Sequence, residues 1–218
     1  MKSILVIGIG RFGQHLCEFL AQQENEIMAV DMKEERLEPI LPMVVSAKIG
    51  DCTNETVLKS LGVDNFDVCF VCIGNNFQNS LEVTSLIKEM GAKHVVSKAN
   101  RKLHARLLLK NGADDVVYPD RDVAEKIAIR YSANHVFDYT ELAGGVSIYE
   151  ILPLKGWIGK SIKELNIRQV YGISIIGSKD AQGTVTVLPE ADHVIQADHH
   201  LMVLGRRKET EKILRELK

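Results

Sequence analysis

The sequence of 218 residues contains no uninterrupted apolar run that approaches the roughly 20 residues a membrane-spanning helix needs. Its start, from Met1 to Gly8, carries one cation and a short apolar stretch. A signal peptide would need a longer apolar core and a small-residue cleavage site, so we interpret this stretch as a strand of the folded protein. We therefore expect a cytosolic protein.

The chain also lacks an excess of either charge. It has 27 Lys and Arg against 29 Asp and Glu, which leaves a formal net charge of −2. This balance gives no electrostatic reason to expect a nucleic acid or an anionic membrane as a direct partner. Hydrophobic residues make up 45% and charged residues 26%, which is ordinary for a globular protein and excludes wholesale disorder.

Cysteine is scarce, with four residues in the chain, namely Cys17, Cys52, Cys69 and Cys72. The spacing of Cys69 and Cys72 is that of a metal or redox pair. These two residues lie in a strand-like run, where side chains three positions apart point to opposite faces. No second pair stands at a zinc-finger spacing. The sequence therefore predicts buried, reduced thiols.

The first part of the chain alternates short β-branched runs with amphipathic stretches. The expected strands are Ser3–Ile9, Glu26–Asp31, Val44–Ile49, Asp67–Ile73, His94–Lys98 and Asp115–Tyr118. The expected helices are Phe12–Gln22, Glu34–Ile40, Asn54–Leu61, Ser80–Met90, Lys102–Lys110 and Val123–Tyr131. Asn79 and Asp122 are predicted as helix starts, and Gly91 and Gly112 as helix ends. Such alternation predicts an α/β fold with a doubly wound, Rossmann-like parallel sheet.

The pattern changes after Tyr131. Residues Asn134–Gly145 end in Glu-Leu-Ala-Gly-Gly, which is typical of a hinge. The strands expected beyond it are Val146–Leu152, Ile173–Ser178, Thr184–Leu188 and His200–Leu204, and the expected helices are Lys160–Leu165 and Arg207–Leu217. This pattern predicts a small C-terminal α+β module.

A glycine-rich turn follows the first expected strand, with the sequence Gly8-Ile9-Gly10-Arg11-Phe12-Gly13. In a strand–turn–helix unit, Gly8 permits the tight turn, Gly10 lets the backbone approach a diphosphate, and Gly13 lets helix and strand pack closely. The free N–H groups of the helix would meet the phosphates. Asp31 ends the next strand, where it could accept hydrogen bonds from both ribose hydroxyls and would repel a 2′-phosphate. The motif predicts a nucleotide site that disfavours NADP.

Other strand ends line the same crevice, because ligands of open α/β sheets bind beyond the carboxyl ends of the strands. The candidates there are Asp51, Cys52, Gly74, Asn75, Asn76 and Lys98. Asp51 could reach the adenine edge or cap a helix beside Thr53. Asn75 and Asn76 could equally be turn residues.

Arg11 and Phe12 occupy the variable positions of the turn. A long cation at position 11 points toward the phosphates or toward a neighbouring subunit, and a guanidinium suits a terminal phosphate. The alternative is a solvated surface arginine.

A hydride-transferring enzyme would need a substrate domain and an acid or base facing the nicotinamide. The C-terminal module is small for a substrate domain, and no acid partner for Lys98 is evident. The sequence therefore favours binding over catalysis. The alternative is a small NAD-dependent oxidoreductase that relies on Lys98 or a histidine.

Together these motifs resemble the RCK (KTN) subunits of bacterial Trk/Ktr potassium uptake systems. The resemblance rests on the glycine-rich turn with Arg11 and Phe12, Asp31, Gly74-x-Asn76, Lys98-Ala99, Gly112-Ala113-Asp114 and Tyr118-Pro119-Asp120. Residues 1–135 match the Rossmann-like nucleotide-binding lobe with its crossover helix, and residues 140–218 match the C-terminal (RCK-C, TrkA-C-like) lobe.

The resemblance implies a cytoplasmic gating subunit without enzymatic activity. Dimers of it would assemble into an octameric ring under a potassium-translocating subunit at the inner face of the membrane. ATP and ADP hold such rings in different shapes, and some members bind NAD(H). By this resemblance Asp31 binds the ribose, Arg11 reaches the terminal phosphate of the neighbouring subunit's ATP, and the helix at Val123–Tyr131 packs on the dimer partner.

Two further ligands follow from the same resemblance. Asp120 aligns with an acidic residue, commonly glutamate, that helps to hold a divalent cation (Mg²⁺ or Ca²⁺) between subunits; the alternative is a turn or cap residue. Some members bind cyclic di-AMP between C-terminal lobes, which makes Arg168 a candidate contact. The alternative there is a surface arginine.

Overall fold

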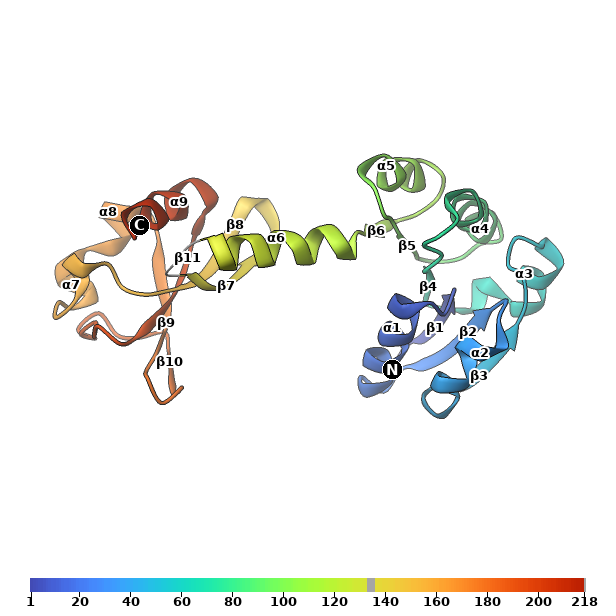
Figure 1. The fold of residues 1–218 in the computed structure, drawn as a ribbon, viewed down its shortest axis with the longest axis horizontal. Coiled ribbons are helices and arrows are strands. Elements are labelled where there is room, and N and C mark those ends of the chain that lie inside the picture. The colour runs from blue at the N-terminus through green and yellow to red at the C-terminus, as the bar shows by residue number, and fades with distance from the viewer. Residues whose placement is uncertain (133–135, 218) are drawn as a thin grey trace. The chain divides into compact units, whose positions relative to one another are not determined.

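The structure is a computed structural model that describes residues 1–132 and 136–217. The chain divides into two compact units, Met1–Asp120 and Arg121–Lys218. Figure 1 shows the elements of both units. Within the described residues, none of the helices is both long and apolar enough to cross a bilayer.

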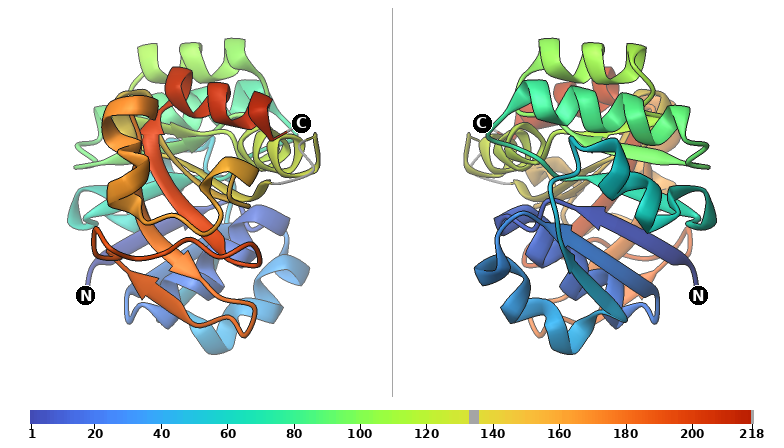
Figure 2. Two further views of the ribbon diagram at one scale, coloured as in Figure 1. Left: turned by 90° about the vertical axis from the view of Figure 1, so that its left-hand side faces the viewer. Right: turned by 90° about the vertical axis from the view of Figure 1, so that its right-hand side faces the viewer.

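The first unit is a six-stranded parallel sheet with the strand order β3-β2-β1-β4-β5-β6. Its strands are β1 (Ser3–Ile7), β2 (Glu26–Asp31), β3 (Ser46–Ile49), β4 (Val68–Val71), β5 (Val95–Lys98) and β6 (Asp115–Val117). Its helices are α1 (Arg11–Gln22), α2 (Glu34–Leu37), η1 (Glu38–Met43), α3 (Glu55–Leu61), η2 (Val63–Asn65), α4 (Phe77–Glu89) and α5 (Lys102–Lys110). The prediction of a doubly wound, Rossmann-like fold is confirmed (Figure 2, right).

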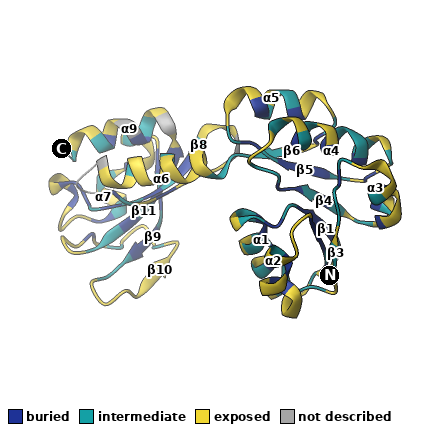
Figure 3. Cartoon of the chain, turned by 45° about the vertical axis from the view of Figure 1, so that its right-hand side comes forward, coloured by how far each residue is buried: buried dark blue, intermediate teal, exposed yellow. Residues whose placement is uncertain are grey.

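The central strand β1 explains why this sheet is covered on both faces. Leu5 and Ile7 pack into one hydrophobic cluster with α3 and α4, while Ile4 and Val6 pack into another with α1 and η1. A strand that is apolar at four successive positions, from Ile4 to Ile7, cannot lie on a sheet with a solvated face, so helices must cover both sides. The inner strands β1 and β5 are mainly buried, whereas the edge strands β3 and β6 contain no buried residue (Figure 3).

The four cysteines are buried and unpaired, as predicted. Cys69 packs with Leu5 in the first cluster, whereas Cys72 packs with Ile4 in the second. The two side chains therefore lie on opposite faces of the sheet. Burial raises the pKa of each of these two thiols to about 12, so both are protonated at neutral pH.

Two predicted helix starts are wrong. Helix α4 begins at Phe77 rather than near Asn79, because the side chain of Asn76 accepts a hydrogen bond from the Asn79 backbone N–H and caps the helix. Asp122 lies inside α6, which spans Pro119–Ser132 and begins at a proline whose fixed φ suits the first helical position.

Helix ends agree better with the prediction. Gly91 and Gly112 follow α4 and α5 at φ values of +89° and +113°, in the region that favours glycine. The expected helix at Glu34–Ile40 instead divides into α2 and the 3₁₀ helix η1. Pro39 lacks the N–H that would bond to the carbonyl group of Glu35, so the α-helix ends there.

The second unit is an antiparallel sheet with the strand order β10-β9-β11-β8-β7. Its strands are β7 (Val136–Glu141), β8 (Val146–Ile151), β9 (Ser174–Lys179), β10 (Val185–Val187) and β11 (His200–Arg206). Its helical elements are most of α6, then η3 (Ala143–Gly145), η4 (Lys155–Trp157), α7 (Ile162–Leu165), α8 (Ile167–Tyr171) and α9 (Arg207–Glu216). The prediction of an α+β module is confirmed.

The core of this unit contains Trp157, which is 1% exposed and meets Tyr171 edge-on at a centroid distance of 5.1 Å. The sequence analysis missed α8 and β7. The expected hinge at Asn134–Gly145 begins outside the described residues, and Val136–Glu141 forms β7 instead of a linker. The contacts divide the chain at Asp120, whereas the lobes 1–135 and 140–218 stay a prediction.

Candidate nucleotide-binding site

A cleft of about 670 Å³ lies in the first unit at the carboxyl ends of β1 to β5. Strand β1 pairs with β2 on one side and with β4 on the other, so the order of the strands reverses at β1. The loops that leave β1 and β4 turn to opposite faces of the sheet at this point, which opens a crevice between them. The chain therefore forms the cleft where open α/β sheets bind ligands.

The three glycines of the turn have three different surroundings. Gly8 has φ +91°, and a Cβ there would lie 3.2 Å from the backbone of Cys72 and Ile73. A Cβ at Gly13 would collide with the carbonyl oxygen of Gly8. Around Gly10 no atom lies within 4 Å of such a Cβ. Gly8 and Gly13 are thus required by the fold, whereas the space at Gly10 is open to a ligand.

The N-terminus of α1 faces this space. Gly10 is its N-cap residue and provides no side-chain hydrogen bond, and the first turn contains no acidic residue. The first N–H groups of a helix have no partner within the helix, and they carry part of the positive end of the helix dipole. An anionic group of a ligand therefore finds donors here without displacing a protein side chain.

Asp31 ends β2 and is only 6% exposed. Its Oδ2 accepts the backbone N–H of Ile9 at 2.7 Å and faces Arg36 Nη1 at 3.4 Å, while its Oδ1 accepts the backbone N–H of Lys33 at 2.9 Å. These bonds fix the carboxylate at the end of β2, on the wall of the cleft. They also occupy much of its capacity to accept hydrogen bonds.

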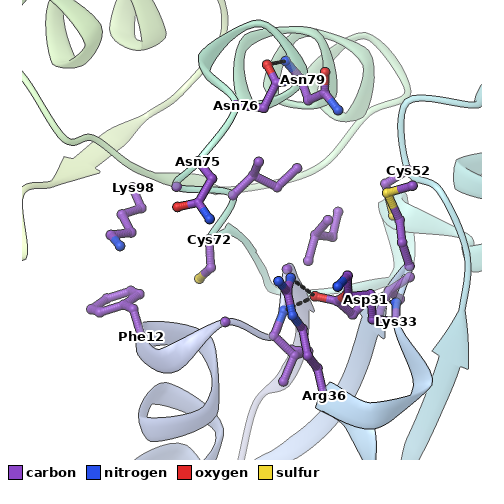
Figure 4. Close-up of a pocket in the computed structure, with 18 of the residues that line it drawn as sticks. Phe12, Asp31, Lys33, Arg36, Cys52, Cys72, Asn75, Asn76, Asn79 and Lys98 are labelled. Carbon is purple, nitrogen blue, oxygen red and sulfur yellow. Dashed lines mark hydrogen bonds and ion pairs between the residues drawn. The ribbon is translucent and has the colours of Figure 1, made fainter.

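The cleft includes residues that the sequence analysis missed. Lys33 and Arg36 line it beside Asp31, together with Met32, and Gln14, Thr53 and Asn79 line other parts. Figure 4 shows Lys33 and Arg36 beside Asp31. The sequence does contain a signal for these residues, since two cations follow Asp31 within five positions. A helix as short as α2 has no periodicity that predicts which of its side chains face the cleft.

Asp51 stabilises the turn that precedes α3 but does not cap this helix, whose N-cap residue is Asn54. Its Oδ1 accepts both the backbone N–H of Thr53 at 2.9 Å and the Thr53 hydroxyl at 2.7 Å. Oδ2 takes part in neither of these bonds, and Asp51 lines the cleft wall. The neighbouring Cys52 is buried, and burial is the main reason that its pKa rises to about 12, so its thiol adds a neutral surface.

The far wall joins the ends of β4 and β5. Lys98 Nζ lies 5.5 Å from the centre of the Phe12 ring, and the Asn100 side chain donates to the carbonyl oxygen of Gly74. A Cβ at Gly74 would approach Lys98 Nζ to 3.3 Å. Figure 4 shows Lys98 and Phe12 facing each other across this end of the cleft. The ammonium group of Lys98 therefore lies opposite the start of α1.

The structure brings most of the predicted site residues together. The cleft is lined by Gly8, Gly10, Arg11, Phe12, Asp31, Asp51, Cys52, Gly74, Asn75, Asn76 and Lys98. Gly13 packs beneath the lining, against Gly8. Asp120 is exposed in the first turn of α6, and Arg168 is exposed on α8 in the second unit. Neither lies in the cleft. No group of three His, Cys, Asp or Glu residues in the described part of the chain is arranged to hold a metal ion.

Comparison with known proteins identifies the family. The TrkA-N domain matches residues 4–119 and the TrkA-C domain matches residues 146–218. The chain belongs to the TrkA family. This TrkA-family chain is 40% identical to the Ktr system potassium uptake protein C of Bacillus subtilis (strain 168) over 204 residues, which are 94% of this chain and 92% of that protein. It is 35% identical to the Ktr system potassium uptake protein A of the same strain, over 97% and 95% of the two chains.

A solved structure shares the fold. The TrkA-family chain aligns with the GsuK channel bound to NAD at a TM-score of 0.70 and 20% sequence identity. The alignment covers 100% of this chain and 39% of the channel chain. The Rossmann-like unit followed by a smaller antiparallel unit is therefore an arrangement found in a known channel protein.

Proposed function

We propose that the chain is a nucleotide-binding gating subunit of a Ktr-type potassium uptake system. The observation that carries the proposal is the cleft at the switch point, where an uncapped helix N-terminus and Gly10 face open space. The relationship to two Ktr system potassium uptake proteins over nearly their whole length supplies the potassium system.

Adenine nucleotides suit the cleft best. Asp31 lies where the ribose would be held, and the free oxygen of Asp51 can accept the exocyclic amine of adenine. The phosphates would extend over Gly10 toward Lys98. ATP and ADP are the proposed ligands, with NAD(H) as a further one, since the GsuK channel binds NAD.

Binding rather than catalysis fits the groups that line the cleft. Among the described residues no histidine lines it. The thiols of Cys52 and Cys72 are held protonated by burial, with pKa values of about 12, and cannot serve as bases near neutral pH. We therefore propose that the chain is not an enzyme.

Assembly with further copies is part of the proposal. Val123, Ile127 and Tyr131 stand four residues apart on α6 and are 55%, 52% and 77% exposed. Positions i, i+4 and i+8 share one side of a helix, so these side chains form an apolar stripe in contact with solvent. A second copy would cover it, and dimers built in this way would form the octameric ring.

Further ligands and the location of the protein complete the proposal. Asp120 would contribute to a divalent cation site between subunits, and Arg168 to a cyclic di-AMP site between C-terminal lobes. The ring would lie in the cytoplasm against the membrane-embedded potassium-translocating subunit. Asp120 and Arg168 are both exposed, which such shared sites require.

Substitution of Arg11 tests the proposed function. It is exposed and lines the cleft at the start of α1, where it can reach a terminal phosphate of a neighbouring subunit's ligand. We expect Arg11→Ala to remove the preference for ATP over ADP in calorimetry while ADP still binds, and Arg215→Ala, an exposed arginine of the second unit, to change neither affinity. Equal ATP preference in Arg11→Ala and the unmodified protein would contradict this role, and no heat with any adenine nucleotide would contradict the proposed function.

A further inference from the structure

The carboxylate of Asp31 has little room left for both hydroxyls of a ribose. Each carboxylate oxygen accepts about two hydrogen bonds. Oδ2 already faces two donors, the Ile9 N–H and Arg36 Nη1, whereas Oδ1 has one, the Lys33 N–H. One ribose hydroxyl can therefore bond to Oδ1 while the protein contacts remain. The other hydroxyl position lies against a carboxylate oxygen that is occupied.

Arg36 is the group next to that second position. It lines the cleft from α2, and its side chain is 39% exposed. Its guanidinium donates a long hydrogen bond to Asp31 from Nη1, which leaves most of its five N–H donors to a ligand. The Arg36 carbonyl oxygen accepts a 3.4 Å hydrogen bond from the Gln14 side chain, which ties α2 to α1. The cation is thus held at the ribose rim with free donors.

The residues that line this end of the cleft carry two charges of each sign, and three glutamates line the adjacent depression. Asp31 and Asp51 are negative, and Lys33 and Arg36 are positive. Lys33 Nζ turns to Glu35 at 3.4 Å, in a side depression that Glu34 and Glu38 also line. Arg36 is therefore the cation that offsets the charge of Asp31. The expectation that Asp31 repels a 2′-phosphate treated this carboxylate as alone, which it is not.

A guanidinium is well matched to a phosphate. Its planar donors can form two parallel hydrogen bonds to phosphate oxygens, and an arginine near the ribose is a known way to accommodate a 2′-phosphate in Rossmann-like sites. The contact of Arg36 with Asp31 is long, at 3.4 Å, and the Arg36 side chain is 39% exposed, so its guanidinium can turn to a phosphate while buried Asp31 keeps its two backbone hydrogen bonds.

Resting on the proposed nucleotide function, we propose that Arg36 forms a phosphate subsite at the ribose 2′ position. The cleft then binds 2′-phosphorylated adenine nucleotides as well as unphosphorylated ones. Asp31 holds the remaining 3′ hydroxyl through Oδ1, and Arg36 binds the 2′-phosphate.

Three small ligands test the proposal in calorimetry with the full-length protein after removal of bound nucleotide. Adenosine 5′-monophosphate is the reference, adenosine 2′,5′-bisphosphate adds the phosphate, and adenosine 3′,5′-bisphosphate carries the same charge at the wrong position. We expect the 2′,5′ compound to bind within about tenfold of the monophosphate, and the 3′,5′ compound to bind at least tenfold more weakly than the 2′,5′ compound.

Variants assign the effect to one side chain. Arg36→Met keeps the length of the side chain and removes its charge, and we expect it to weaken binding of the 2′,5′ compound about tenfold or more and of the monophosphate less than threefold. Arg36→Lys should retain part of the difference. Lys59→Met, which loses an exposed cation of α3 paired with Glu55, is the matched control and should leave all three affinities unchanged.

The possible negative results distinguish failure of the phosphate subsite from failure of the proposed function. If the monophosphate binds and the 2′,5′ compound does not, or if both bisphosphates bind equally, the subsite is wrong and the nucleotide site stands. The subsite is also wrong if Lys59→Met and Arg36→Met have equal effects. If neither the monophosphate, ADP nor ATP gives heat with the unmodified protein, the proposed function itself fails.

Discussion

The two units of the chain contain sheets of similar size but differ in what their strand ends can form. In the first unit the strands are parallel, so the carboxyl ends of β1 to β5 meet at one edge and their loops line a single cleft. In the second unit neighbouring strands are antiparallel, so successive loops leave from opposite edges. Strand direction therefore decides where side chains from distant parts of the sequence can gather.

The two sheets also differ in how they are buried. Strand β1 is buried at four successive positions, whereas β8 and β11 alternate between buried and partly exposed residues. The alternating pattern is that of a sheet with one face on a core and the other toward solvent or a partner. The difference indicates that helices cover both faces of the first sheet, whereas one face of the second sheet is only partly covered.

The largest expected effect tests whether the units fold separately. Leu201 is fully buried on β11, between β8 and β9. We expect Leu201→Ala to lower the unfolding free energy of the second unit by about 2–5 kcal/mol, the usual cost of removing a large core side chain. ADP affinity, measured by calorimetry, should change less than threefold. Loss of ADP binding in a folded sample would show that the two units form one cooperative structure.

A smaller loss is expected from the turn of the first unit. In Gly13→Ala the added methyl group would meet the Gly8 carbonyl oxygen, which is backbone and can move only with β1. We expect a loss of about 1–3 kcal/mol in unfolding free energy, as in other overpacked sites. Urea unfolding followed by circular dichroism measures it. Gly156→Ala in the second unit, where the methyl group meets nothing within 4 Å, is the control and should be nearly neutral.

Gly10→Ala tests ligand binding separately from the stability of the fold. Its methyl group would enter open space, so the unfolding free energy should change by no more than about 1 kcal/mol, the usual scale of exchanging an N-cap residue. The same space is where a diphosphate would approach the backbone, so the dissociation constant for ADP should rise about tenfold or more, or about 1.4 kcal/mol. Unchanged ADP affinity would mean that the phosphates lie elsewhere.

The smallest expected effect lies in the second unit and depends on pH. Burial pushes the pKa of Glu150 upward, but hydrogen bonds from His200 at 2.8 Å and Lys179 at 3.0 Å outweigh it, so this pKa lies below the ordinary value of 4.5. A lowered pKa in the folded state stabilises the fold above pH 4.5, and this stabilisation disappears as the pH falls through the folded-state pKa.

Glu150→Gln should therefore reduce the loss of stability in acid. We expect the unmodified protein to lose on the order of 1 kcal/mol more than the variant between pH 6 and pH 3, as for hydrogen bonds to a charged group. Urea unfolding at the two pH values measures the difference. Parallel losses in both proteins would show that other carboxylates dominate.

The sequence predicts the first unit better than the second, for a physical reason. A strand buried on both faces, such as β1, is apolar at successive positions, and a glycine such as Gly112 is needed where φ is positive, so both features are local. Strand β7 includes Asp138 and Glu141 beside a glycine-rich turn, and it forms because β8 pairs with it. Pairing between strands is not visible in a local pattern.

The cleft shows the same limit. Its lining from the glycine-rich turn to Lys98 follows from strand ends that the sequence marks clearly. Arg36 was missed because its place on the cleft wall depends on the path of the short helix α2, which Pro39 ends, and on the geometry of its contact with Asp31. The chemistry of a site is therefore more predictable at strand ends than on the helices that close over it.

The single tryptophan of the chain, Trp157, has a practical consequence. It is enclosed in the second unit and does not line the nucleotide cleft. Tryptophan fluorescence, excited at the long-wavelength edge of protein absorption, therefore reports on the C-terminal unit alone. A change of Trp157 emission on addition of ATP would show directly, without a label, that ligand binding in the first unit alters the second unit.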